Sequence, residues 1–135
     1  KVTSRPLTWR FLRSDDELAY LMLSIISVES AGNPRAIGDA GQSFGLGQIQ
    51  LATARQYRPR VTRADLLAIE DHLEIAMAHF MNLLERYNGN CTLAVLAWNR
   101  GSGAVDRTIA SGASPENGYA RRVFTASLLR NGGAY

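Results

Sequence analysis

Apolar residues recur at helical spacing along most of this chain, and polar or glycine-rich segments interrupt them. After a lead-in at residues 1–13, Ser14 and Glu17 have the spacing of a helix cap and its reciprocal glutamate. The helix continues to Ser30, and Gly32-Asn33-Pro34 stops it. The same reasoning predicts one or two helical turns within 51–57, a weaker helix start at Thr62–Asp65, a long amphipathic helix from about Asp71 to Tyr87, and shorter helices at Cys91–Trp98, Ala104–Ala110 and Tyr119–Arg130.

Residues 37–50 break this helical pattern because four glycines interrupt them. Such a segment predicts a tight loop or a short hairpin in which the backbone comes close to another part of the molecule. The remainder of the chain is mostly helical, apart from a tail at residues 131–135. The sequence therefore predicts a mainly α protein, with one domain over residues 1–135 and a small glycine-rich loop or β-hairpin.

The composition supports a folded domain. The chain has 135 residues, of which 46% are hydrophobic and 20% are charged, whereas disordered chains are poorer in apolar groups. The net charge of +3 permits an anionic partner, such as nucleic acid, an acidic wall polymer or a membrane surface, but does not require one. The longest mostly apolar run, Leu18–Val28, is too short to span a membrane. We expect a monomer with no stable membrane insertion, and no recognition-helix pattern supports a nucleic-acid partner.

Neither the single cysteine nor the two histidines indicate a metal site. Cys91 cannot form a multi-cysteine site and is predicted to be a small buried hydrophobic residue. His72 and His79 are seven positions apart on one predicted helix, which separates them by about 10 Å, and no HExxH pattern is present. We interpret both as structural or surface histidines. The sequence predicts no metal and no cofactor.

Glu29 is the strongest candidate for chemistry. It continues the apolar stripe of Leu18, Met22 and Ile25 at steps of four, three and four, and it lies at the C-terminal end of its helix. Burial and the negative end of the helix dipole both oppose ionisation and predict a raised pKa. A carboxylic acid that stays protonated near neutral pH is what a general acid needs. The alternative is a glutamate at a helix end that faces water or pairs with Arg35.

Two polar segments complete the candidate site. Residues 41–50 space amides and a serine among glycines, which suits hydrogen bonding to an N-acetylated sugar, although a structural turn is the alternative. Trp98 next to Asn99 can stack on a sugar face while the amide binds an acetamido group, but tryptophan is more often a core residue. Asp39 is either a solvated turn residue or a group that assists a water in a hydrolase.

Four segments together resemble the motifs of one enzyme family. Residues 26–34 resemble the xxExSxxNP opening of the soluble lytic transglycosylase catalytic domain, which has a goose-type-lysozyme-like fold. Residues 45–49 resemble its GLMQI motif, residues 88–101 its GN…ALAAYNAG motif, and residues 118–123 its closing Y…V motif. Four motifs in the right order make a specific signal. The resemblance implies a lysozyme-like domain of several helices around a groove.

The resemblance also implies a reaction and its residues. Lytic transglycosylases cleave the β-1,4 bond between N-acetylmuramic acid and N-acetylglucosamine in peptidoglycan and leave a 1,6-anhydromuramic acid end. One carboxylate, here Glu29, acts first as acid and then as base, and the substrate's acetamido group stabilises the reacting centre. Substrate-assisted glycosidases need no second carboxylate, and the sequence offers no convincing one. By position in the motifs, Gln48 and Asn99 would orient the sugar, and Tyr119 matches the tyrosine that lies near the acid. The other substrate-binding candidates are Trp98, from its aromatic face, and Ser43 and Gln50, as neighbours in the groove.

Two positions depart from the family pattern. The motif tyrosine is Trp98, which loses a phenol hydroxyl and keeps an aromatic face. The motif methionine is Gly47, which predicts a wider groove or a more accessible backbone. Neither change removes the acid.

The sequence thus favours a peptidoglycan lytic transglycosylase whose partner is the glycan strand. We expect it to act in the bacterial cell envelope, in the periplasm, with delivery by a phage particle, a phage lysis system or a secretion apparatus as further settings. The alternatives are a hydrolytic muramidase (lysozyme) on the same fold and a non-catalytic cell-wall-binding module.

Overall fold

A computed structural model describes residues 10–130 of the chain, with side chains to residue 127. Within these residues the protein is mainly helical, with one small sheet. The helices are α1 (Asp15–Ser30), α2 (Leu51–Ala54), α3 (Arg63–Leu67), α4 (Ile69–Arg86), α5 (Cys91–Arg100), α6 (Ser102–Ala110) and α7 (Tyr119–Arg130), and the strands are β1 (Ile37–Gly38), β2 (Ser43–Phe44) and β3 (Ile49–Gln50). Most of the predicted lead-in and all of the predicted tail lie outside the described residues.

Helix α1 begins and ends close to where the sequence predicts. The Ser14 hydroxyl accepts a hydrogen bond from the Glu17 backbone N–H at 3.1 Å. The expected return bond is wrong, because the Glu17 carboxylate accepts from the Arg13 N–H at 2.8 Å instead of from Ser14. The helix ends where Ala31 takes a left-handed conformation (φ 53°) and donates its N–H to the Ser27 carbonyl.

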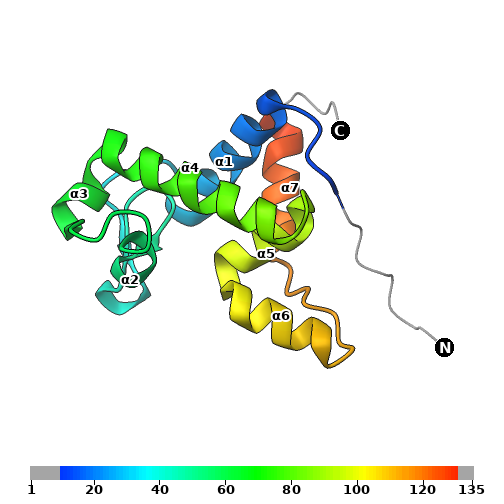
Figure 1. Cartoon of the computed structure of the whole chain (residues 1–135). Coiled ribbons are helices and arrows are strands. Elements are labelled where there is room, and N and C mark those ends of the chain that lie inside the picture. The colour runs from blue at the N-terminus through cyan, green and yellow to red at the C-terminus, as the bar shows by residue number, and fades with distance from the viewer. Residues whose placement is uncertain (1–9, 131–135) are drawn as a thin grey trace.

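Helices α1, α5 and α7 supply many of the buried side chains of the core. Helix α1 packs along α7, and α5 contacts α4, α6 and α7 (Figure 1). The stripe of Leu18, Met22 and Ile25 is buried, as predicted. On α5 nearly every side chain from Cys91 to Ala97 is buried, which explains why a short helix with little polar surface is stable here. Helix α6 projects away from these three helices (Figure 1).

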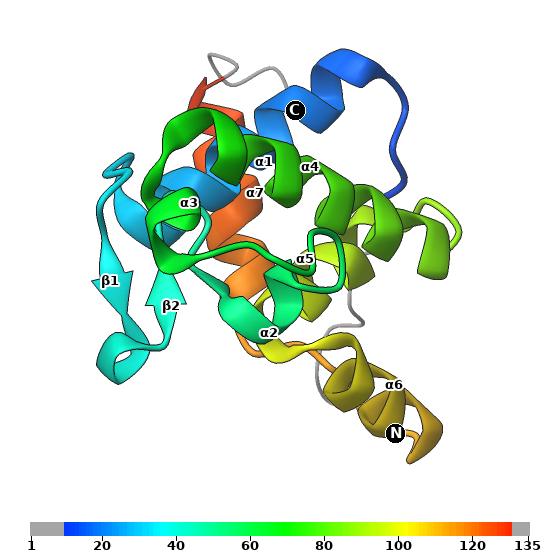
Figure 2. The same ribbon diagram turned by 60° about the vertical axis from the view of Figure 1, so that its left-hand side comes forward.

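The glycine-rich segment forms a three-stranded antiparallel sheet in the order β1-β2-β3, so the hairpin prediction is correct but one strand short. Ile37 pairs with Phe44, which pairs in turn with Ile49. The sheet lies beside α3 and α2 at one end of the molecule (Figure 2). Gly45 has a φ of 78°, and a Cβ there would collide with the Leu66 carbonyl of α3 and with His72 of α4. Backbone does come close to another part of the molecule, as predicted.

The start of the described chain is tied to the turn between α4 and α5. The Cys91 N–H donates to the Arg10 carbonyl at 2.6 Å, and the Leu12 N–H donates to the Gly89 carbonyl at 3.0 Å. Cys91 itself is buried, and burial raises the pKa of its thiol to about 12, as expected for an inert core cysteine. No helix within residues 10–130 is long and apolar enough to cross a membrane.

Candidate active site

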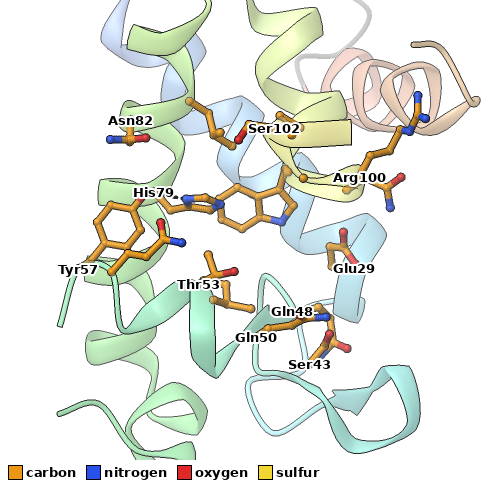
Figure 3. Close-up of a pocket in the computed structure, with 18 of the residues that line it drawn as sticks. Glu29, Ser43, Gln48, Gln50, Thr53, Tyr57, His79, Asn82, Arg100 and Ser102 are labelled. Carbon is orange, nitrogen blue, oxygen red and sulfur yellow. Dashed lines mark hydrogen bonds between the residues drawn. The ribbon is translucent and has the colours of Figure 1, made fainter. Parts of the chain in front are cut away.

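A cavity of about 510 Å³ lies between the sheet with α2 and the two helices α4 and α5 (Figure 3). Glu29, at the end of α1, lies at one end of it, and Tyr57 and His79 lie at the other (Figure 3). The lining is mostly polar, and it contains Glu29, Asp39, Ser43, Gln48, Gln50, Thr53, Gln56, Asn82, Asn99, Arg100 and Ser102. A cavity with many fixed hydrogen-bonding groups suits a hydroxyl-rich ligand.

Glu29 is half-buried and points into the cavity (Figure 3). Burial raises the pKa of its carboxyl above the ordinary value, and the charge of Asp39 adds to the rise. A hydrogen bond from the Tyr119 hydroxyl to Glu29 Oε2, at 2.7 Å, lowers this pKa in part. The predicted alternative, an ion pair with Arg35, does not form among the described residues.

Tyr119 is a buried residue that lies against the Glu29 carboxyl. Its side chain is 2% exposed and does not line the cavity, so its contact is with Glu29 and not with the open space. Burial and the nearby Glu29 raise the pKa of the Tyr119 phenol, which keeps it a hydrogen-bond donor. Arg122, one turn further along α7, lies over the tyrosine ring at 5.5 Å, and its charge also lowers the pKa of Glu29.

The sheet contributes a hydroxyl and two amides. Ser43 is buried, and its hydroxyl donates to Asp39 Oδ2 at 2.6 Å. Gln50 is exposed at the end of β3. The Gln48 side-chain amide donates to the carbonyls of Ala36 (3.1 Å) and Gly45 (3.0 Å), so its nitrogen is committed to the protein and only its oxygen is left for a ligand.

Aromatic rings from α4 and α5 form the wall opposite the sheet. Trp98 is half-buried, and its indole Nε1–H donates to the Gly47 carbonyl at 3.1 Å. The His79 ring lies 5.1 Å from the Trp98 ring, and its Nδ1 lies 2.7 Å from the Tyr57 hydroxyl. Burial lowers the pKa of His79 to about 4, so this ring is neutral at pH 7. The wall therefore offers ring faces without charge.

The end of α5 is held to the loop before α7. Asn99 is exposed at the cavity, and its Oδ1 accepts from Asn117 Nδ2 at 2.8 Å. Asn117 Oδ1 in turn accepts the Tyr119 backbone N–H at 3.1 Å, at the start of α7. Arg100 lines the cavity, but its guanidinium points away from it (Figure 3) and donates to the Pro115 carbonyl at 2.7 Å.

A family model described as "Transglycosylase SLT domain" matches residues 13–119, most of the chain's 135 residues. The chain belongs to this family. SLT domains cleave glycosidic bonds in peptidoglycan, so the lytic transglycosylase fold and substrate class predicted from the four motifs are confirmed. The mainly α, lysozyme-like architecture of this SLT domain is confirmed by the helices and the small sheet.

The SLT domain gathers six of the seven predicted site residues around one cavity: Glu29, Ser43, Gln48, Gln50, Trp98 and Asn99. Tyr119 lies against Glu29, outside the cavity lining, and its role as a substrate contact stays a prediction. The two expectations for Gly47, a wider groove or a more accessible backbone, are wrong. The Trp98 ring occupies the space beside Gly47, and the Gly47 N–H and carbonyl are both hydrogen-bonded.

Sequence reasoning missed three residues of this site. His79 was grouped with His72 as structural or surface, and Tyr57 was placed only at the end of a short helix, yet both line the cavity. Their spacing from the motifs gives no signal, because Tyr57, which follows α2, and His79 of α4 come together only in the fold. Asn117 gave a usable signal, since an asparagine side chain commonly bonds the backbone N–H two residues further along. No cluster of metal-binding side chains occurs within residues 10–130.

Proposed function

We propose that this chain is a peptidoglycan lytic transglycosylase that cleaves the β-1,4 bond between N-acetylmuramic acid and N-acetylglucosamine, with Glu29 as its one catalytic residue. The observation that carries the proposal is the half-buried Glu29 carboxyl, whose pKa is raised by burial, at the end of a polar cavity. Such a group holds its proton at a pH where an exposed glutamate has lost it.

In the first step, the protonated Glu29 carboxyl gives its proton to the glycosidic oxygen as the bond from that oxygen to the muramic acid C1 breaks. The N-acetylglucosamine side leaves with a free 4-hydroxyl. The acetamido oxygen of the muramic acid supplies electrons to C1, so no protein nucleophile is required. Glu29 is left as a carboxylate, and the Tyr119 hydroxyl that donates to its Oε2 stabilises that charge.

In the second step, the Glu29 carboxylate takes the proton of the muramic acid 6-hydroxyl while O6 forms a bond to C1. The acetamido group is released and the 1,6-anhydro ring closes. Glu29 is protonated again, and no water is consumed. Tyr119 contributes by positioning the acid, since its buried ring holds the hydroxyl at one place beside Oε2.

The remaining predicted residues are proposed to bind the sugars. Gln48 Oε1 and the Gln50 amide offer hydrogen bonds from the sheet side, and Asn99 offers its amide N–H2 because Asn117 occupies its oxygen. Ser43 donates to Asp39, so its oxygen is available as an acceptor. Trp98 offers the edge or face of its ring from α5.

We further propose that residues 1–135 act as one lysozyme-like catalytic domain, as a monomer without a metal or cofactor. Its place of action is the bacterial cell envelope, in the periplasm, reached through a phage particle, a phage lysis system or a secretion apparatus in some settings. The peptidoglycan substrate defines the envelope as the site of action.

The position of Asp39 supports one alternative function, a hydrolytic muramidase. Asp39 lines the same cavity as Glu29, so a hydrolytic muramidase in which Asp39 assists a water is chemically possible. We favour the transglycosylase because the Asp39 carboxylate already accepts the Ser43 hydroxyl and lies on an exposed turn.

The test is mass spectrometry of the soluble products that wild type and Glu29→Gln release from purified peptidoglycan. We expect muropeptides that end in 1,6-anhydromuramic acid from wild type and none from the variant. Products heavier by one water would make the protein a hydrolase. Retained binding to the wall, with no product from either protein, would favour a non-catalytic wall-binding module.

A further inference from the structure

Side chains from two different helices hold both polar groups of the Gly47 backbone. The Gly47 N–H donates to His72 Nε2 of α4 at 2.8 Å, and its carbonyl accepts the Trp98 Nε1–H of α5 at 3.1 Å. His72 Nδ1 lies 2.8 Å from the Leu66 carbonyl, which can only accept, so Nδ1 carries the proton and Nε2 is free to accept. His72 is 1% exposed, and burial lowers its pKa, which keeps the ring neutral in this role.

The space beside Gly47 is filled by the same two rings. A Cβ at this position would lie 2.8 Å from Trp98 Cζ2 and 3.2 Å from His72 Nε2. Trp98 cannot easily move away, because the Phe80 ring lies 6.1 Å from it and the His79 ring 5.1 Å. Glycine is therefore required at position 47 because a side chain does not fit there. Its φ is not in the left-handed region, so the backbone conformation is not the reason.

The residue held next in the chain is Gln48. Its φ of 54° lies in the left-handed region, which costs free energy for any residue other than glycine. Such a conformation persists only where the surroundings impose it. Here the clamp on Gly47 fixes one side of Gln48, and the two side-chain amide bonds to Ala36 and Gly45 fix the other.

We propose that Gly47 and Trp98 form one coupled pair and that Trp98 is a positioning residue, which holds Gln48 at the cavity through the Gly47 carbonyl. This inference rests on the proposed function, because it assigns Gln48 a sugar contact. It also joins the two departures from the motif: a tryptophan at position 98 and the loss of the methionine side chain at position 47 concern the same contact. At positions 47 and 98 the chain then departs from the motif through one combined change and not through two separate ones.

The first experiment tests the coupling through stability and needs no substrate. Gly47→Met should lower the Tm by about 5 °C or more, because a new side chain is forced against two packed rings. Trp98→Tyr removes part of the indole and opens that space. The double variant Gly47→Met with Trp98→Tyr should recover much of the lost Tm. Ala52→Met, at an exposed position on the neighbouring helix α2, controls for the added methionine.

The second experiment asks whether Trp98 acts through Gln48. Trp98→Phe keeps an aromatic ring, although a smaller one, and removes the N–H that reaches Gly47. We expect it to raise KM on soluble glycan strands about five- to tenfold, with a smaller change in kcat and an unchanged pH profile, because Glu29 is untouched. In a Gln48→Met background the same change should have little further effect on KM.

The outcomes separate this inference from the proposed function. Additive Tm changes for positions 47 and 98, or a Trp98→Phe effect on KM that is equally large with Gln48→Met, would overturn the coupled pair while the enzyme remains active. The second result would mean that Trp98 affects KM through its own ring alone and not through Gln48. Wild-type protein that releases no product from peptidoglycan would overturn the proposed function, and the positioning role would fall with it.

Discussion

Two carboxylates line the cavity, Glu29 and Asp39, and their surroundings differ. Glu29 ends a helix, is half-buried, and accepts a hydrogen bond from the hydroxyl of a buried tyrosine. Asp39 lies on the exposed turn after β1 with a φ of 50°, and it accepts the hydroxyl of Ser43 at 2.6 Å. A place in the cavity is therefore not what distinguishes Glu29 from Asp39. Burial distinguishes it, and that burial raises the pKa of Glu29.

The two groups also act on one another. The negative charge of Asp39 raises the pKa of Glu29, while the positive charge of Arg122 lowers it. In the proposed reaction, Asp39 would therefore support Glu29 through its charge, without a proton transfer of its own. We assign Asp39 two tasks on this basis, to hold the Ser43 hydroxyl and to help keep Glu29 protonated.

Matched amide variants give the largest expected difference between the two carboxylates. Glu29→Gln should lower kcat on glycan strands by about 10³-fold, because it removes the transferable proton and keeps the shape. Asp39→Asn should lower it by less than about tenfold, because the amide oxygen can still accept from Ser43 and only a charge is lost. The measurement is the initial rate of soluble product release. Equal losses for the two variants would contradict the single-acid assignment and would favour a hydrolase with two working carboxylates.

A change behind the acid should move its pH dependence. Tyr119→Phe removes the hydrogen bond that lowers the pKa of Glu29, so that pKa should rise further. Since Glu29 works when protonated, the alkaline limb of the kcat–pH profile should move to higher pH, while kcat at the optimum falls about tenfold because the acid is less well positioned.

Asp39→Asn provides the control of opposite sign. It removes a charge that raises the pKa of Glu29, so the alkaline limb should move to lower pH. Shifts of both variants in the same direction, or a limb that neither variant moves, would show that the limb reports a group other than Glu29.

Part of this site could be predicted from sequence because helical periodicity is local. The stripe that ends at Glu29 places the carboxyl at the core edge, and burial follows from that placement alone. The roles of Tyr119 and Asp39 could not be derived in this way. Tyr119 is 90 residues away from its partner along the chain, and Asp39 acts on Glu29 only once the turn after β1 is folded.

The Gly47 departure shows a different limit. Read alone, a glycine in place of a larger residue predicts more space, and this prediction was wrong because the neighbouring ring came from a helix 51 residues further along. The departures at positions 47 and 98 lie in separate motifs, and their connection can be recognised only when the fold has brought the two residues into contact. The His72 clamp was hidden for the same reason, since a buried histidine and a surface histidine look alike in a helical pattern.

The two carboxylates should also differ, by a smaller amount, in how they make the stability of the fold depend on pH. A carboxyl whose pKa is raised by folding contributes stability that is fully present below its unfolded pKa of about 4.5 and is lost as the pH rises through the folded value. Glu29 should therefore cost the fold some stability at pH 8 that it does not cost at pH 4. Glu29→Gln cannot ionise and escapes this loss. The difference in Tm between Glu29→Gln and wild type should grow by a few degrees from pH 4 to pH 8, in favour of the variant.

Taking this difference cancels the titration of His72 and His79, which wild type and variant share. Asp39→Asn, the matched change at the exposed carboxylate of the same cavity, is the control. Thermal unfolding followed by circular dichroism measures both differences. A Tm difference for Glu29→Gln that is constant with pH would mean that Glu29 ionises as easily in the folded protein as in the unfolded chain, and the contrast between the two carboxylates would then disappear.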